Sequence, residues 1–347
     1  MNSSHLTWLS KQIARNILRT WLEQKAKLSG AAFSCRVLKG TSSYNLAINS
    51  DMSVSCNCQD FDGAGRLGDL SINSLTEILS GEKAQYFRKT LAEGKLPLLN
   101  CTRCVELEMV ASDQALEASK IIAVPHKNIM IENTILCGCN CLSCARPQVM
   151  RNRKKLALSL DDIGIIAEEI KRHGISSLAY FNLGDPFLSS SIYDELALIK
   201  KVNPHLSIYT STNGLYLDSP AKFEAALLTD RIGISIDGID SAMVRKYQRN
   251  GDFERSFGNM CRLVSYRNKQ SQNKTEIMWN YILFNWNDKP KNIIQAQQLA
   301  RQAGIDTLSL CHTKSPLWGT SWRWYTNKFY REIRKGQSSQ FLAIPIV

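Results

Sequence analysis

The chain has 347 residues, 44% of them hydrophobic, which is enough for one large domain or two ordinary domains with a buried core. No apolar run approaches the roughly 20 residues that a membrane-spanning helix needs. The N-terminus has no secretory signal, so we expect a cytoplasmic protein without a membrane span. The formal net charge of +12 fits a solubilising surface, which we favour, or an anionic small-molecule or glycan substrate. Nothing but charge supports nucleic acid, so we do not expect a nucleic-acid partner.

The first 110 residues predict an amphipathic helix followed by a small α+β unit. In residues 1–29, apolar residues recur mostly three and four positions apart, which gives a helix with one apolar face: Trp8, Leu9, Ile13, Ile17, Trp21 and Leu22. Residues 30–110 contain short strand candidates at 46–48 and 53–55. A helix follows that Asn73 or Ser74 can cap, with Glu77 at capping-box distance from Ser74.

Residues 125–314 alternate strands and helices. Strand candidates lie at 129–131, 178–182, 206–209, 232–236, 277–284 and 307–311, and helical stretches at 159–173, 191–201, 220–228, 252–267 and 291–303. Such alternation with short links predicts a parallel sheet with helices packed outside it. Six units are three-quarters of an eight-unit barrel, so the predicted fold class is α/β, a partial (β/α)6 barrel of the TIM type. Residues 315–347 are aromatic and basic, and we expect a helix there that closes the open side.

The chain has eleven cysteines, which is many for a cytoplasmic protein. In a reducing compartment, clustered cysteines more often bind metal than form disulfides. The close groups are Cys56 with Cys58, Cys101 with Cys104, and Cys137 with Cys139, Cys141 and Cys144; Cys35 lies shortly upstream, and Cys261 and Cys311 stand alone.

The strongest motif is the octet from Cys137 to Cys144, in which Cys137, Cys141 and Cys144 form a C-x3-C-x2-C set after the first strand. Three thiolates can bind three irons of a [4Fe-4S] cubane and leave the fourth iron open. The rival is a zinc site, although zinc sites usually pair two separated C-x2-C knuckles. The spacing, its place after a strand and the alternation that follows resemble the radical S-adenosylmethionine (SAM) superfamily. Ser143 stands where that family usually has an aromatic residue, and Cys139 does not fit the family spacing, so we assign it no ligand role.

Later motifs extend the resemblance to about residue 314. Gly184, Asp185 and Pro186 follow the second strand and are similar to the family's Gly-Glu-Pro motif, with Asp185 in place of Glu. The resemblance implies that this backbone receives the amino group of SAM. It also implies cofactor contacts for Asn213 after the third strand, and for Ser235 and Asp237 at the end of the fourth. Taken singly, these residues read as ordinary turns or helix caps.

The cysteines of residues 30–110 resemble a SPASM domain, an accessory iron-sulfur module of many radical SAM enzymes. Cys56, Cys58, Cys101 and Cys104 would ligate one auxiliary [4Fe-4S] cluster, and Cys35 could replace one of them. The module normally follows the barrel, whereas here it precedes it. The rival is again a zinc site, since C-x-C with C-x2-C also suits tetrahedral zinc.

The resemblance implies that an electron from a donor such as flavodoxin or ferredoxin enters the first cluster and passes to SAM. The resulting 5′-deoxyadenosyl radical then takes hydrogen from an unactivated C–H bond. Oxidation or epimerisation of a sugar or glycan-type natural product is the favoured outcome. The alternatives are modification of a peptide or protein, and a non-enzymatic zinc or iron-sulfur protein. Cys311, at the end of the sixth strand, is the candidate hydrogen donor, although lone cysteines are often core residues.

Overall fold

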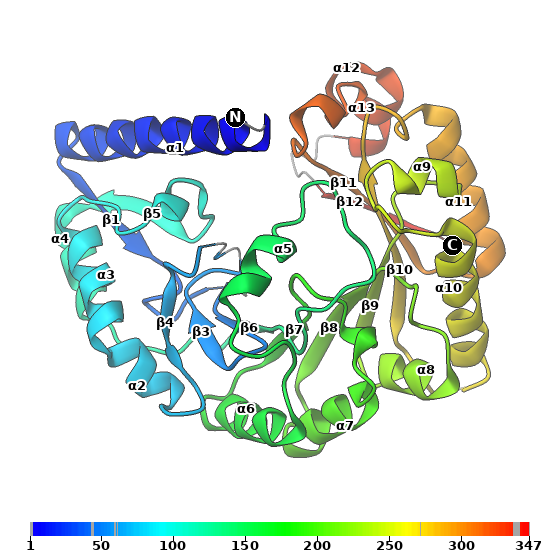
Figure 1. The fold of residues 1–347 in the computed structure, drawn as a ribbon, viewed down its shortest axis with the longest axis horizontal. Coiled ribbons are helices and arrows are strands. Elements are labelled where there is room, and N and C mark those ends of the chain that lie inside the picture. Colours follow the sequence, from blue (N-terminus) through cyan, green and yellow to red (C-terminus); the bar gives the residue numbers. More distant parts are fainter. Residues whose placement is uncertain are drawn as a thin grey trace.

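The computed structural model describes residues 3–42, 45–58, 60, 62–270, 272–335 and 341–346, with side chains from residue 12 onward. It is a mixed α/β protein whose larger sheet has the strand order β12-β11-β10-β9-β8-β7-β6-β2-β3-β4. The sheet is curved, and helices follow the outside of the curve (Figure 1).

Six neighbouring strands of this sheet are parallel and follow one another along the chain. They are β6 (Asn128–Ile131), β7 (Ser177–Tyr180), β8 (Ser207–Thr212), β9 (Arg231–Ser235), β10 (Glu276–Leu283) and β11 (Thr307–His312). All six were predicted from the sequence, and their ends shift by three residues at most. The carboxyl ends of the strands therefore meet along one edge, where ligands of parallel α/β proteins collect.

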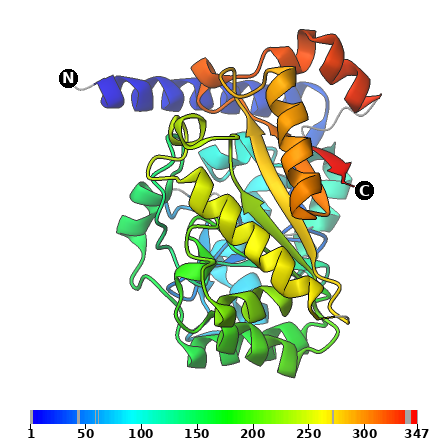
Figure 2. The ribbon, with the colours of Figure 1, turned by 90° about the vertical axis from the view of Figure 1, so that its right-hand side faces the viewer.

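The predicted helices lie between these strands: α6 (Leu160–Arg172), α7 (Ile192–Val202), α8 (Pro220–Leu227), α10 (Phe253–Asn268) and α11 (Pro290–Ala303), with the short α9 (Ser241–Arg245) added. Figure 2 shows α10 and α11 lying over the outer face of the sheet. Apolar side chains alternate along the strands because one sheet face packs on these helices. In β10, for example, Ile277, Trp279, Tyr281 and Leu283 are fully buried, and the residues between them are only half-buried.

The N-terminal segment shares the large sheet. Strand β2 (Ala47–Ile48) pairs parallel with β6, and β3 (Ser53–Ser55) and β4 (Arg66–Asp69) extend the sheet as antiparallel strands. A second, two-stranded sheet joins β1 (Ala31–Cys35) to β5 (Leu107–Ala111). Around them lie α1 (Ser3–Leu28), α2 (Leu75–Ser80), α3 (Glu82–Ala92), the 3-10 helix η1 (Leu99–Arg103) and α4 (Ser112–Lys120).

Two predictions for this segment are confirmed. Ser74 caps α2, and the capping box with Glu77 is complete. Residues 3–28 form the expected helix, of which Ile13, Ile17 and Trp21 are more than half exposed; the side chains of Trp8 and Leu9 lie outside the described part of the chain. Among the described residues, no helix is both long and apolar enough to cross a lipid bilayer.

The tail differs from the prediction of a helix that closes the open side. It forms η4 (Leu317–Gly319), α12 (Arg323–Thr326), α13 (Lys328–Arg334) and the strand β12 (Phe341–Pro345). β12 pairs antiparallel with β11, so the tail lengthens the sheet at its edge. Its period-two pattern is only one strand long and follows a helix rich in aromatic residues, which is why the sequence did not reveal it.

Candidate metal centre and cofactor site

The loop with the cysteine octet leaves the carboxyl end of β6. Its base is held by the segment that precedes α6, because Ile135 N donates to Leu156 O (2.9 Å) and Leu158 N donates to Asn133 O (2.8 Å). The short helices α5 (Arg146–Val149) and η2 (Met150–Asn152) carry the chain back to this base. These two backbone hydrogen bonds hold the two ends of the loop together, and we call this paired base the stem.

The three predicted ligands of this loop lie together. Cys137, Cys141 and Cys144 are half-buried, and Cys144 lies close enough to the other two for their charges to raise the pKa of its thiol, although burial is the larger cause. Cys139 is buried, and a hydrogen bond from its thiol to Cys137, the neighbouring Cys141 and burial raise its pKa. The bond from Cys139 is the main cause that lowers the pKa of Cys137 to about 7.

The residues of this loop fit an iron-sulfur cluster by their chemistry. Among the described residues, no group of three or more His, Cys, Asp or Glu side chains converges on the position of a single metal ion. Three thiolates can each bind one iron of a cubane. A cavity of about 530 Å³ adjoins the loop and is lined by Cys137, Gly138, Cys139, Asn140, Arg146, Pro147, Met150, Arg151 and Asn250. N–H groups of the kind that stabilise thiolates also reach the loop: Arg146 N lies 3.4 Å from Cys144 Sγ.

The Gly-Asp-Pro motif packs directly against the stem. Asp185 N donates to Leu136 O (2.7 Å), and a Cβ on Gly184 would lie 1.8 Å from Thr134 O, so only glycine fits there. The buried Asp185 carboxylate accepts bonds from Phe187 N, and from Thr212 Oγ1 and Asn213 N, each at 2.9 Å. Burial raises the pKa of Asp185, and these bonds oppose the rise.

Asp185 therefore orients Asn213 at the end of β8. The Asn213 amide Nδ2 lies 3.5 Å from Cys137 Sγ, which brings the predicted cofactor residues after β7 and β8 to the cysteine loop. Pro186 begins the 3-10 helix η3 (Pro186–Leu188) and is buried. The side chain of Asp185 is fully engaged by the chain itself, so its part in the site is to position its neighbours.

The side chains of Ser235 and Asp237, at the end of β9, have different partners. Ser235 Oγ faces Ser211 Oγ at 3.5 Å and is half-buried. The Asp237 carboxylate is buried and accepts from Ile282 N (2.8 Å), and burial raises its pKa to about 7. Ser235 thus pairs with a side chain of β8, whereas Asp237 is engaged by the backbone of β10.

A contact that we did not predict comes from the segment after α9. Asn140 N donates to Arg249 O (2.9 Å), and Leu142 N donates to Tyr247 O (3.0 Å), so this segment pairs with the cysteine loop. Backbone carbonyls make both contacts, so the side-chain types of Tyr247 and Arg249 could not indicate them. Cys311 lies on β11 opposite Ile282, is half-buried, and burial raises the pKa of its thiol to about 12.

The second cysteine group contains a member that the spacing did not select. Cys35, Cys56, Cys101 and Cys104 line one cavity together with apolar side chains of α3 and of the segment before η1. Burial, with smaller contributions from the neighbouring Cys104 and Cys101, raises the pKa of Cys35 to about 12. Asn57 Nδ2 donates to Cys104 Sγ at 3.0 Å.

Cys58 lies outside this cavity. Its thiol donates to Asn45 Oδ1 (3.0 Å), and its side chain packs with Ala47, Met130, Ala179 and Phe181 on the sheet face that carries no helix. Cys58 and Cys56 are two positions apart next to a strand, yet their sulfurs have different surroundings. Cys58 is thus absent from the cavity that Cys35, Cys56, Cys101 and Cys104 line, but it remains near this group, because burial and the neighbouring Cys104 raise the pKa of its thiol to about 11.

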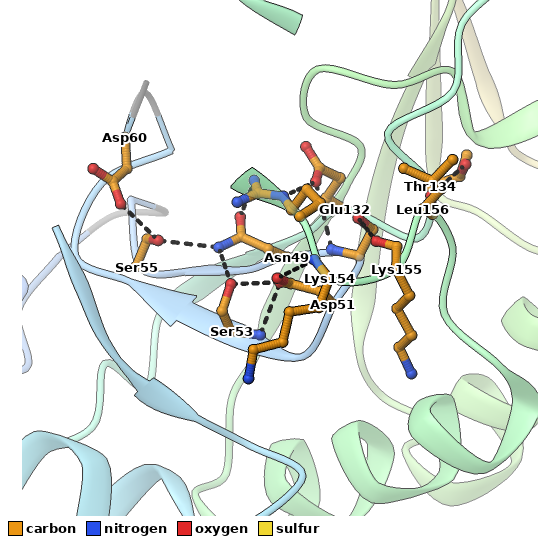
Figure 3. Close-up of polar contacts among 12 residues, drawn as sticks. Asn49, Asp51, Ser53, Ser55, Asp60, Glu132, Thr134, Lys154, Lys155 and Leu156 are labelled. Atoms are coloured by element: carbon orange, nitrogen blue, oxygen red, sulfur yellow. Dashed lines mark hydrogen bonds and ion pairs between the residues drawn. The ribbon is translucent and has the colours of Figure 1, made fainter. Parts of the chain in front are cut away.

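A buried polar network joins the two cysteine regions (Figure 3). Arg153, just after η2, donates to Glu132 Oε1 (3.0 Å) at the end of β6 and to Asn49 Oδ1 (2.7 Å) in the β2–β3 turn. Asn49 Nδ2 in turn donates to Ser55 Oγ (3.0 Å), next to Cys56. Figure 3 shows further bonds of the same junction through Asp51, Ser53, Asp60, Lys154 and Lys155.

Comparison with known proteins finds one matching family model and several solved structures of low sequence identity. Residues 134–278 match the sequence model of the radical SAM superfamily. The fold is similar to native anSMEcpe with bound AdoMet, with 14% identity and a TM-score of 0.40 over 52% of this chain and 50% of that chain. It is also similar to TsrM from Kitasatospora setae, with 12% identity and a TM-score of 0.41 over 55% of this chain and 38% of that chain. This chain thus matches half or less of the length of these proteins. No curated protein matches it.

Proposed function

We propose that this chain, which contains a radical SAM domain at residues 134–278, is an enzyme that cleaves SAM reductively and uses the 5′-deoxyadenosyl radical to take hydrogen from a substrate C–H bond. We infer that its parallel strands form a partial (β/α)6 barrel with this chemistry at their carboxyl ends. The cofactors supply the radical, and the chain's own residues hold, orient and shield it.

The observation that carries the proposal is the group of Cys137, Cys141 and Cys144 on one stem-held loop of that domain. These three thiols would hold a [4Fe-4S] cluster and leave one iron for SAM. Gly184 lets the β7 loop approach the stem, and Asp185 holds Asn213 against Cys137. Ser235, at the carboxyl end of β9 on the same edge, would contact SAM.

We further propose that Cys35, Cys56, Cys101 and Cys104 hold an auxiliary [4Fe-4S] cluster in a SPASM-like module. Their shared cavity and the N–H···S bond from Asn57 to Cys104 support this set. Cys58 is left as a thiol. The network through Arg153 and Asn49 connects the segments that carry the two cysteine groups.

Two outcomes for the substrate follow from the groups near the site. In an oxidation, the substrate radical loses an electron to the auxiliary cluster and a proton to solvent. In an epimerisation, the Cys311 S–H bond breaks, its hydrogen atom goes to the opposite face of the substrate carbon, and an external reductant restores the thiol with one electron and one proton. The raised pKa of Cys311 supports the second outcome, because the protonated thiol is the hydrogen donor.

Electrons for SAM cleavage would come from a reductase partner such as flavodoxin or ferredoxin. The eleven cysteines are all free thiols, which favours a reducing compartment such as the cytoplasm.

The direct test is an anaerobic assay of reconstituted protein with SAM and dithionite. We expect 5′-deoxyadenosine from the wild-type protein and none from Cys137→Ala. Cys261→Ala, which changes a thiol on α10, is the matched control and should retain the activity. Wild-type protein that carries iron and sulfide but yields no 5′-deoxyadenosine would rule the proposal out.

The auxiliary ligand set is tested by comparing Cys35→Ser with Cys58→Ser. We expect reconstituted Cys35→Ser to lose about half of its iron and sulfide, as expected when one of two cubanes is lost, and Cys58→Ser to keep it. The reverse result would return Cys58 to the ligand set and remove Cys35.

A further inference from the structure

The cysteine loop lies in a strongly basic part of the molecule. Residues 137–155 contain five Lys or Arg and no Asp or Glu, and residues 245–250 contain three Lys or Arg and no Asp or Glu. The two segments lie against each other, because the backbone N–H groups of Asn140 and Leu142 donate to carbonyls of the second segment. These two segments therefore concentrate positive charge around the predicted cluster ligands.

Ion pairs divide these cations into two sets. Four have an acidic partner: Arg153, Lys154, Lys155 and Arg245. Within the described part of the chain, the others form no ion pair: Arg146, Arg151, Lys246 and Arg249. Of this second set, Arg151, Lys246 and Arg249 are exposed, and we call these three the basic rim. The rim is thus a positive surface whose charge is not neutralised by the chain itself.

Arg146, the fourth unpaired cation, is engaged with the loop. Its Nη2 donates to Cys139 O (3.1 Å), and its Nη1 lies 3.8 Å from Met150 Sδ. The bond from Cys139 is the main cause that lowers the pKa of Cys137 to about 7, and the Arg146 charge contributes to the same shift. Arg146 therefore acts on the loop, whereas the rim is free for a partner.

The cavity of about 530 Å³ beside the loop connects the rim to a predicted ligand. Arg151 and Asn250 line it together with Cys137, and Asn250 directly follows Arg249 of the rim. Pro147, Met150 and other residues of the loop and of the helices after it complete the wall. A partner seated over this cavity would face Cys137.

The composition of this surface suits a protein partner. An apolar centre with a charged rim is typical of transient protein interfaces. Redox partners in particular bind through small interfaces and are brought together by opposite charge. A single phosphate would instead need several donors that converge on it. The Arg146 guanidinium is already bound to Cys139, and the rim residues come from two separate segments, so a broad acidic surface fits better.

We propose that the basic rim and its cavity form the docking site of an acidic one-electron carrier protein. The inference rests on the proposed radical SAM function and adds the place where the electron enters. In the transfer, the carrier is oxidised by one electron and the loop cluster is reduced by one; no bond forms or breaks and no proton moves. Opposite charge speeds the encounter, so the rim acts on kcat/KM for the carrier and leaves the later chemistry unchanged.

The test compares two electron supplies for the reconstituted full chain, with 5′-deoxyadenosine as the measured product. One supply is an acidic carrier, flavodoxin or ferredoxin, kept reduced by NADPH and its reductase. The other is saturating dithionite with methyl viologen, which needs no docking. We expect the double variant Arg151→Glu, Lys246→Glu to lower kcat/KM for the carrier about tenfold and to keep the dithionite-driven rate within about twofold of the wild type.

Lys274→Glu is the matched control, because Lys274 is an exposed cation just before the amino end of β10, at the edge of the sheet opposite the cysteine loop. It should change neither rate. The two single variants of the rim should each lower kcat/KM about threefold, and they keep the test valid if the double variant does not fold.

Three results would overturn the inference: no turnover of the wild type with either carrier, an unchanged kcat/KM in the rim variants, or an equal fall with carrier and with dithionite. Loss of polyuridylate RNA binding in the double variant, with normal carrier kinetics, would assign the rim to nucleic acid and overturn it as well. The proposed function fails separately, if the wild type yields no 5′-deoxyadenosine with dithionite.

Discussion

At the scale of single residues, the four cysteines of the loop divide by their contacts. Cys139 is the most buried of them, and its thiol interacts with Cys137 and Cys141. The sequence excluded Cys139 on spacing alone. The structure adds that its buried thiol lowers the pKa of the proposed ligand Cys137.

The first prediction concerns this thiol. Cys139→Ala removes a contact but no proposed ligand, so reconstituted protein should keep the iron and sulfide of the loop cluster. Cys144→Ala removes a ligand and should lose most of that iron. Both are measured by chemical iron and sulfide analysis on protein that also carries Cys56→Ser, which is expected to empty the auxiliary site. Equal losses from the two variants would assign Cys139 to the cluster.

The residue scale also shows where sequence reasoning stops. Spacing predicts that Cys101 and Cys104 act as a pair, because two intervening residues keep both cysteines on one turn. Spacing does not show which of Cys56 and Cys58 faces the cavity. Both residues follow the end of a strand, where side chains no longer alternate regularly between two faces. Nor does spacing bring in Cys35, which reaches the cavity only through the pairing of β1 with β5.

At the scale of elements, helix α6 starts at a double cap. Ser159 Oγ accepts from Asp162 N, and the Asp162 carboxylate accepts from Ser159 N. Lys155 also binds this carboxylate, so the cap fixes the segment that returns from the cysteine loop.

The second prediction is that Ser159→Ala lowers the free energy of unfolding by about 1 kcal/mol, the usual cost of a lost cap. Urea denaturation measures it, and an unchanged midpoint would contradict it.

The third prediction concerns the pH dependence of the same cap. Burial raises the pKa of Asp162, but the bonds from Lys155 and Ser159 outweigh it and hold the pKa below the ordinary 3.8. An acid with a depressed folded-state pKa stabilises the fold above its unfolded pKa, and this is lost as the pH falls through the folded value. Asp162→Asn should therefore flatten the decline in unfolding free energy below about pH 4. A variant with the same acid decline as the wild type would contradict this assignment.

A second junction between elements is the buried ion pair of Arg153 and Glu132, whose side chains are 7% and 0% exposed. Arg153→Met would leave a buried carboxylate without its partner, which typically costs about 3–5 kcal/mol. The fourth prediction is a loss of this size in chemical denaturation. Lys154→Met is the matched control, because that side chain is 68% exposed and should change stability by under about 1 kcal/mol. Similar losses of stability in the two variants would contradict the claim that this ion pair stabilises the fold.

At the scale of the whole molecule, the N-terminal segment and the six parallel strands share one sheet. Strand β2 covers the edge of β6, and Leu46, Ile48, Ile129 and Ile131 belong to the same apolar core. The sequence located β2 and β6 but predicted two separate units. A two-residue strand carries no readable periodicity, and its partner 80 residues later is fixed only by tertiary packing.

The fifth prediction follows from this shared sheet. A fragment of residues 125–347 would expose the edge of β6 and the apolar residues that β2 covers, so we expect it to aggregate where the full chain does not. Sedimentation of the two proteins, purified in the same way, measures this. A monomeric fragment with a cooperative unfolding transition would show instead that the two parts are independent.

The measurement closest to the central claim is electron-nuclear double resonance on the reduced, reconstituted Cys35→Ser protein, which keeps only the loop cluster, with SAM labelled at its amino nitrogen. If Cys137, Cys141 and Cys144 leave one iron uncoordinated by protein, the labelled nitrogen should couple directly to the cluster spin. A fully ligated cluster, with a spectrum that labelled SAM leaves unchanged, would contradict the account.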